Sequence, residues 1–206
     1  MESDIKYRFG QKYRHELKYK ISAADYLSIR QRIKPVMKTD SHADANGRYR
    51  IFSIYFDNIY DKALLEKING VQKREKFRIR FYNNDFSFIA LEKKVKYNDL
   101  CIKESASLSK EEFFSVLSGN REQLKENSSQ LVKELYCKTE FQQLRPRVLV
   151  SYVREAYIDA PGNVRVTFDS DIRTSLFTQE FLKTDFNGIG VTDNSTDMIL
   201  EVKFDD

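Results

Sequence analysis

The sequence predicts an α+β fold, in which an antiparallel β-sheet or β-barrel carries helices inserted between its strands. Strand-like segments, where apolar side chains alternate with polar ones, recur from residue 13 to residue 206. Helix-start signals lie between several of them, such as the capping box of Ser109 and Glu112. No internal repeat or linker interrupts the series, so residues 1–206 are expected to form one domain.

The first half of the chain predicts strands over 13–21, 48–57, 75–82 and 86–98. Ser22 is the expected N-cap of a helix over residues 22–34 that ends before Pro35. Residues 58–71 form a short helix or an ordered turn closed by Gly70. The segment 101–108 either continues the fourth strand or forms another after a turn.

The second half predicts two helices followed by three strands. The helices are expected over 109–119, with Gly119 as C-cap, and over 120–138, and the strands over 145–159, 164–173 and 198–206. Residues 187–197 are expected to be a loop. The total is seven or eight strands, enough for a closed or nearly closed antiparallel sheet.

Charged side chains gather on one face of most predicted strands. In "EKFRIRFY" (75–82), Lys76, Arg78 and Arg80 share one face, and Phe77, Ile79 and Phe81 share the other. One-faced charge of this kind is usual for a sheet that faces water. However, a solvated face normally mixes charge signs, and the apolar faces are rich enough to pack against helices. The charged faces are therefore interpreted as the inner lining of a closed sheet.

A confined group of cations favours a polyanionic ligand, because crowded bare cations in a low dielectric cost several kcal/mol each (order of magnitude). Arginine forms bidentate bonds with phosphate oxygens, and lysine supplies a mobile charge. Glu16 and Glu201 interrupt the basic lining. They are candidate ligands of a divalent metal that also binds substrate phosphates, although pairing of Glu201 with Lys203 is a plain alternative.

Composition argues against several other classes. Cys101 and Cys137 are expected to be reduced thiols of a cytosolic protein. The net charge of +4 is modest, and most aromatic residues alternate with the cations, so a nucleic-acid binder is disfavoured. No signal peptide, bilayer-spanning segment or Gly-rich phosphate loop is found. Neither His15 nor His42 lies in a catalytic setting.

Seven short motifs then carry a family resemblance, in chain order "ELKYKI", "YFDN", "KFRIRFY", "LEKKVK", "SYVREAY", "VRVTFDSDIR" and "ILEVKF". Together they resemble the VTC domain, the polyphosphate polymerase domain of the vacuolar transporter chaperone family. That family is a branch of the triphosphate tunnel metalloenzymes, which are CYTH-like. The resemblance covers nearly the whole chain. It implies an antiparallel β-barrel, the triphosphate tunnel, with peripheral helices.

The resemblance also implies an activity, the transfer of the γ-phosphate of ATP onto a growing polyphosphate chain with Mn²⁺ or Mg²⁺. Lys18 resembles the lysine near the reacting phosphate, and Arg78 and Arg80 resemble the arginines that clamp the triphosphate. Further phosphate ligands are expected at Lys94, Lys96, Lys103, Arg154, Arg165 and Lys203, and metal ligands at Glu201 and Glu16. The assignment of Lys96 depends on the strand register. Asp169 and Asp171 could assist the metal, but we expect them to pair with Arg165 or Arg173 instead. Tyr19, Tyr55, Tyr82 and Tyr152 are expected to serve packing.

The sequence departs from the family pattern at two places. Arg14 occupies the first position of the Glu-x-Glu-x-Lys start of the wider superfamily, a loss shared by the VTC branch. After "EVKF" the chain ends at Asp206, without the C-terminal helix and basic element that family members carry, which bears on catalytic competence. Two alternatives stay open, a triphosphate or polyphosphate hydrolase and a non-catalytic polyphosphate or nucleotide sensor.

The resemblance gives ATP and polyphosphate as partners. The reduced cysteines and the lack of a signal peptide predict a cytoplasmic location. Because relatives act at membranes, the resemblance adds the cytoplasmic face of a membrane and a membrane-protein partner as expectations. Nothing in this chain anchors it to a bilayer.

Overall fold

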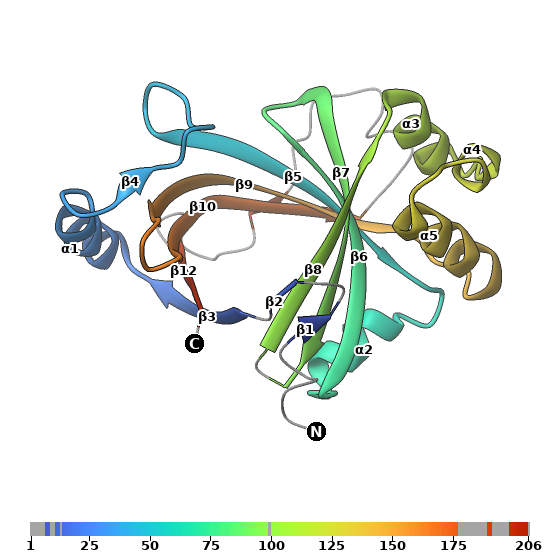
Figure 1. Cartoon of the computed structure of the whole chain (residues 1–206), viewed down its shortest axis with the longest axis horizontal. Coiled ribbons are helices and arrows are strands. Elements are labelled where there is room, and N and C mark those ends of the chain that lie inside the picture. Colours follow the sequence, from blue (N-terminus) through green and yellow to red (C-terminus); the bar gives the residue numbers. More distant parts are fainter. Residues whose placement is uncertain are drawn as a thin grey trace.

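Eight antiparallel strands form a closed ring in the computed structural model (Figure 1), which describes residues 7–8, 11–12, 14–98, 100–176, 189–190 and 198–205. The strands follow one another around the ring in the order β10, β12, β3, β8, β7, β6, β5, β9 and back to β10. Their bounds are β3 (Arg14–Ile21), β5 (Arg48–Asp57), β6 (Lys73–Tyr82), β7 (Asp85–Tyr97), β8 (Leu100–Leu108), β9 (Arg145–Asp159), β10 (Val164–Leu176) and β12 (Met198–Phe204). The predicted closed antiparallel sheet is confirmed.

The ring is held least extensively where β3 meets β8. Among the described residues of β3, only Arg14 and His15 pair with β8, at Cys101 and Leu100. β7 and β8, in contrast, pair along their full shared length from Ile89 to Tyr97. An ion pair across this seam adds to the two backbone pairs, with Lys94 Nζ 2.6 Å from Glu16 Oε1. Side chains inside the ring therefore help to close it.

In the part of the chain that the structure describes, five helices lie outside the ring: α1 (Ala23–Ile33), α2 (Lys62–Ile68), α3 (Lys110–Ser118), α4 (Glu122–Lys125) and α5 (Gln130–Phe141). Ser22 and Ser109 form the capping boxes of α1 and α3. The single helix predicted over 120–138 is wrong. The chain forms α4 and α5 instead, because Asn127 accepts a hydrogen bond from the Ser129 backbone and turns the chain between them.

Strand boundaries mostly follow the prediction, and 101–108 lies within a separate strand, β8. Asn83 and Asn84 make the β6–β7 hairpin turn with positive φ angles of 51° and 57°, which asparagine tolerates better than most residues. The short strands β1 (Tyr7–Arg8), β2 (Gln11–Lys12) and β4 (Lys38–Thr39) were not predicted. Within the loop predicted over 187–197, β11 (Ile189–Gly190) pairs with β10, and the rest lies outside the described residues.

The apolar strand faces point outward into the helical layer, as predicted. Phe77, Ile79 and Phe81 of β6 are fully buried in a core shared with α3 and α5. The phenyl rings of Phe81 and Phe113 pack edge to face at 5.5 Å. This outward burial leaves the opposite, charged face of each strand to line the inside of the ring.

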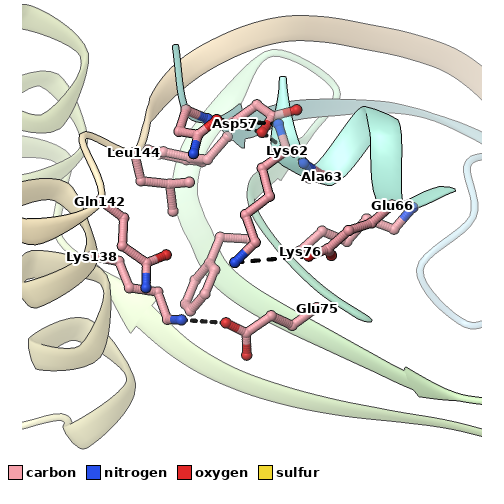
Figure 2. Close-up of a pocket in the computed structure, with 12 residues that line it drawn as sticks. Asp57, Lys62, Ala63, Glu66, Glu75, Lys76, Lys138, Gln142 and Leu144 are labelled. Carbon is pink, nitrogen blue, oxygen red and sulfur yellow. Dashed lines mark hydrogen bonds and ion pairs between the residues drawn. The ribbon is translucent and has the colours of Figure 1, made fainter. Parts of the chain in front are cut away.

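Helix α2 turns its polar face, not an apolar one, toward the ring. Its polar side chains, Lys62 and Glu66, face a small cavity of about 30 Å³ between β5, β6 and α5 (Figure 2). Lys138 of α5 pairs with Glu75 of β6 in the same cavity. The apolar side chains Leu64, Leu65 and Ile68 are exposed instead. None of the helices in the described ranges has the length and apolarity that crossing a bilayer requires.

Candidate functional site

The interior of the ring contains a polar cavity of about 150 Å³ lined from seven of its eight strands. Strand register brings its charged residues to one face. Arg78 lies opposite Tyr55 and Glu92, and Glu201 lies opposite Lys18 and Thr167. Six cations and three carboxylates line the cavity, namely Lys18, Arg78, Arg80, Lys94, Arg154 and Lys203 with Glu16, Asp169 and Glu201.

A second cavity of about 240 Å³ adjoins the first. The two share Glu16, Arg78, Lys94 and Lys203, and the second adds Lys103 and Arg14. The structure thus brings together nearly all of the basic residues that the sequence predicted as phosphate ligands. They form one run of cations along the inside of the ring.

Several of these cations are paired with carboxylates. This corrects the expectation, based on the strand faces alone, of a lining made of unpaired cations. Buried Glu92 accepts hydrogen bonds from Arg78 Nε at 2.6 Å and from Lys103 Nζ at 2.8 Å. Burial alone would raise the pKa of Glu92, but Arg78, Arg80 and Lys103 outweigh it and lower the pKa to about 2. Glu92 was not among the predicted site residues, although its position two residues before Lys94 placed it on the lining face.

Arg154 and Asp169 form a bidentate pair in which both N–O distances are 2.7 Å, and both side chains are buried. The expected pairing of Asp169 with Arg165 or Arg173 is therefore wrong, whereas Asp171 does pair with Arg173, at 2.9 Å. β9 lies beside β10 in the ring, and the register sets Arg154 directly opposite Asp169. The Arg154 guanidinium also lies over the Tyr152 ring, with its Cζ atom 5.2 Å from the ring centre.

Glu16 and Glu201 sit among lysines. Lys18 Nζ lies 2.8 Å from Glu201 Oε2 and 3.7 Å from Glu16 Oε1, so it contacts both carboxylates. Lys203 also contacts both, at 2.9 Å and 3.6 Å. Burial alone would raise the pKa of Glu201, but Lys203, Lys18 and Arg154 hold it well below its usual range. Both carboxylates are therefore ionised at neutral pH, as metal ligands must be.

The two oxygens of Glu201 face different lysines. Oε2 is paired with Lys18, and the buried Oε1 atom lies 2.9 Å from Lys203 Nζ. In the described ranges, no three His, Cys, Asp or Glu residues converge on one point. A divalent ion held here would have Glu201 and Glu16 as its protein ligands, and phosphate or water oxygens as the rest, a ligand set typical of Mg²⁺.

Two of the tyrosines that were expected to serve packing also line the basic cavity and bind its arginines. The Tyr55 hydroxyl accepts a hydrogen bond from Arg78 Nη1 at 3.1 Å, and the Tyr152 hydroxyl accepts one from Arg80 Nη2 at 3.0 Å. Burial disfavours ionised Tyr55, but Arg78, Arg80 and Lys76 outweigh it and lower the pKa of Tyr55 to about 8. Residues 49, 51, 53 and 55 alternate along β5 with the same period as the cations. This alternation is the sequence signal that could have placed Tyr55 on the inner face of the ring.

Two predicted ligands lie outside these cavities. Lys96 is on the same face of β7 as Lys94, opposite Arg74 and Cys101, but lines neither cavity. Arg165 lines a separate cavity of about 520 Å³. There it donates to Asp40 Oδ2 at 2.6 Å and to the Tyr49 hydroxyl at 3.0 Å.

Comparison with known proteins places this site in context. A model of the VTC domain family matches residues 13–206. A protein of Bacillus halodurans provisionally described as an adenylate cyclase superposes with a TM-score of 0.55 at 14% sequence identity, covering 92% of this chain and 79% of its own. A Hippeastrum protein, provisionally an adenylyl cyclase but with a dominant triphosphatase activity, gives a TM-score of 0.54 at 11% identity, with 94% and 80% covered. These likenesses establish a shared fold. No protein with a curated description matches.

Proposed function

The chain belongs to the VTC domain family, and from that premise we propose that its ring transfers the γ-phosphate of ATP onto a growing polyphosphate chain. The ring has the triphosphate tunnel fold of that family. The observation that carries the proposal is the enclosed cavity in which six cations surround three carboxylates. This excess of positive charge inside a closed ring suits a chain of phosphates and little else.

In this proposal the arginines fix the phosphates. Arg78, Arg80 and Arg154 are held by Glu92, by Tyr152 and by Asp169, so their guanidinium groups are oriented before a substrate arrives. Preoriented donors stabilise the charge that spreads over the transferred phosphoryl group without reorganising during the reaction. The ring would also hold donor and acceptor in line, and such positioning together with charge stabilisation makes up most of phosphoryl-transfer catalysis.

The lysines supply mobile charge. Lys18 and Lys103 are about half exposed and reach carboxylates from the solvent side, so either can turn toward an entering phosphate. The attacking oxygen belongs to a phosphate that is already ionised, so no general base is needed. Glu16 and Glu201 would hold the Mn²⁺ or Mg²⁺ ion, which neutralises phosphate charge when bound. Ion capture at Glu201 would also free Lys18 and Lys203 for the substrate.

A hydrolase acting on triphosphate or short polyphosphate is the second candidate. The triphosphatase activity of the Hippeastrum protein, which shares the fold, favours it. The same cations would bind the substrate, and water would replace the acceptor phosphate. The exposure of Lys18 and Lys103 gives water a route to the cavity.

Turnover with ATP and Mn²⁺ or Mg²⁺ separates the candidates. The polymerase makes long chains visible on a gel stained for polyphosphate, whereas the hydrolase only releases phosphate. The Arg78→Ala variant is expected to lose activity by a factor on the order of a hundred or more, because one oriented charge is removed from the reacting phosphates. Arg32→Ala, an exposed arginine on α1, is the matched control and should keep full activity.

Binding of ATP with neither product would contradict both enzymatic candidates and leave a non-catalytic sensor. Full activity of Arg78→Ala, with its fold verified by circular dichroism, would remove the site assignment.

A further inference from the structure

The cavity that holds Arg165 lies inside one end of the ring and differs in character from the basic cavities. Its volume is about 520 Å³, within the range of small-molecule sites. Its lining consists of Asp40, His42, Tyr49, Tyr82, Asn83, Phe88 and Arg165. The strand residues among them follow the alternation that points inward. Tyr49 lies six positions before Tyr55, which lines the basic cavity, and Phe88 lies four positions before Glu92, which pairs with Arg78.

Three aromatic rings form one wall of this end compartment. The rings of Tyr49 and Tyr82 lie 5.9 Å apart at 61°, and those of Tyr82 and Phe88 lie 6.1 Å apart at 37°. Phe88 is 55% exposed, an unfavourable arrangement for a phenyl ring on the inward face of a strand. A flat apolar ligand stacked on Phe88 and Tyr82 would remove that exposure.

The compartment has little capacity to hold phosphate. Its one guanidinium, Arg165, is engaged by the buried Asp40 carboxylate at 2.6 Å. His42 Nδ1 lies 2.9 Å from the same carboxylate. The negative charge of Asp40 therefore offsets the cation, in contrast to the net positive basic cavity.

The two cavities have no lining residue in common, and Tyr152 lies between them. This residue belongs to the buried cluster of Tyr49 and Ile51, against which Tyr82 packs. Tyr152 also lines the basic cavity and accepts a hydrogen bond from Arg80. Arg80 of the basic cavity and Tyr82 of the end compartment lie two positions apart on β6, so the cationic and aromatic linings are adjacent there. A ligand that reached both would need a polyanionic part and a flat apolar part.

We propose that the end compartment binds the base of a nucleoside triphosphate whose phosphates lie in the basic cavity. The inference rests on the proposed function, and it deepens it by making Phe88 and Tyr82 determinants of the choice between a nucleotide and inorganic polyphosphate. Inorganic tripolyphosphate has no group that would fill the aromatic end, whereas a purine offers a π face for stacking.

Equilibrium binding of ATP and of inorganic tripolyphosphate to the full chain tests the proposal. Phe88→Ala is expected to weaken ATP binding about tenfold, the order usual for loss of one base-stacking ring, and to leave tripolyphosphate binding within about twofold. Phe88→Tyr restores ATP binding, because it keeps a ring for stacking. Phe141→Ala removes an exposed phenyl ring from the end of α5, outside the ring, and should change neither ligand.

Equal weakening of both ligands by Phe88→Ala, or no weakening of either, would overturn the base site, as would a wild-type chain that does not bind ATP. The outcome is separable from that of the turnover assay. A chain that shows the expected binding pattern but makes no product keeps the base site and loses the proposed activity. A chain that makes polyphosphate with unchanged ATP affinity in Phe88→Ala keeps the activity and loses the base site.

Discussion

At the scale of single residues, the site is an ion-pair network rather than a set of free cations. Arg78, Arg154 and Lys94 each have a carboxylate partner before any ligand enters. Removing one partner from a buried pair typically costs about 3–5 kcal/mol, because the other charge is left uncompensated. The carboxylates therefore keep the empty ring stable and the guanidinium groups oriented, and substrate phosphates must compete with them.

Tyr55 makes phosphate binding sensitive to pH. Its pKa of about 8 lies below the ordinary value near 10, mainly because Arg78 and Arg80 overcome the effect of burial. A phosphate chain on Arg78 would raise this pKa again. Affinity for tripolyphosphate is therefore expected to fall as the pH rises through about 8, since binding then requires Tyr55 to take up a proton. Binding titrations from about pH 7 to about pH 9 measure the effect.

The matched variant is Tyr55→Phe, which keeps the ring and removes the ionisable hydroxyl. In this variant, the affinity for tripolyphosphate should fall much less above about pH 8 than it does in the wild type. The effect of pH on the stability of the fold has the opposite sign. The unfolded chain holds the Tyr55 proton up to about pH 10, so this residue's contribution to the free energy of unfolding increases between about pH 8 and pH 10. An unchanged affinity decline in Tyr55→Phe would show that other groups cause it.

At the scale of elements, the outer helices contribute unequally. α3 and α5 bury Phe113, Leu131 and Leu135 against the ring, whereas α2 has no buried residue. The stability of the ring is expected to depend on the former pair. α2 is held by polar contacts, since Asp57 accepts hydrogen bonds from the backbone N–H groups of Ala63 and Leu64.

Two leucine truncations compare these elements directly. Leu135→Ala on α5 removes a fully buried side chain and should lower the free energy of unfolding by about 2–5 kcal/mol. Leu65→Ala on α2 removes a side chain that is 49% exposed and should change it by less than about 0.5 kcal/mol. Urea denaturation measures both. A large loss in Leu65→Ala would mean that something covers the apolar face of α2 in solution.

At the scale of the whole molecule, the closed ring couples ligand binding to stability. Tripolyphosphate contacts residues from opposite walls in the proposed site, including Arg78 on β6 and Lys203 on β12, so it binds the folded chain and not the unfolded one. A concentration a hundredfold above the Kd should add about 2.7 kcal/mol to the free energy of unfolding. The measurement is the Tm by calorimetry, with sodium chloride at equal ionic strength as the control. An equal rise with both salts would exclude specific binding.

Alternation along each strand made much of the site predictable. Arg78, Arg80, Lys94, Glu201 and Lys203 line the interior as predicted, because the two-residue period of a strand fixes which side chains share a face. The outward apolar faces required helices, and the capping boxes located two of them. The same period marked Glu92, Tyr49 and Tyr55, whose roles nevertheless were not recognised.

The alternation did not predict how far along the ring each inward side chain lies, or which side chain it meets there. Arg165 lies on the predicted face but in the end compartment, where Asp40 binds it. Asp169 was assigned to the wrong arginine for a related reason. Its neighbour across the sheet depends on the register between β9 and β10, which is set by their pairing and by a bulge after Ser170.

The sequence by itself determined which face of each strand is charged, because that property depends only on the order of residues along the strand. Only the tertiary structure decided which charges meet and where the lining becomes aromatic. The physical reason is that ring closure and register bring together residues as distant as Lys94 and Glu16, or Arg165 and Asp40, and the distances between such partners set their electrostatics.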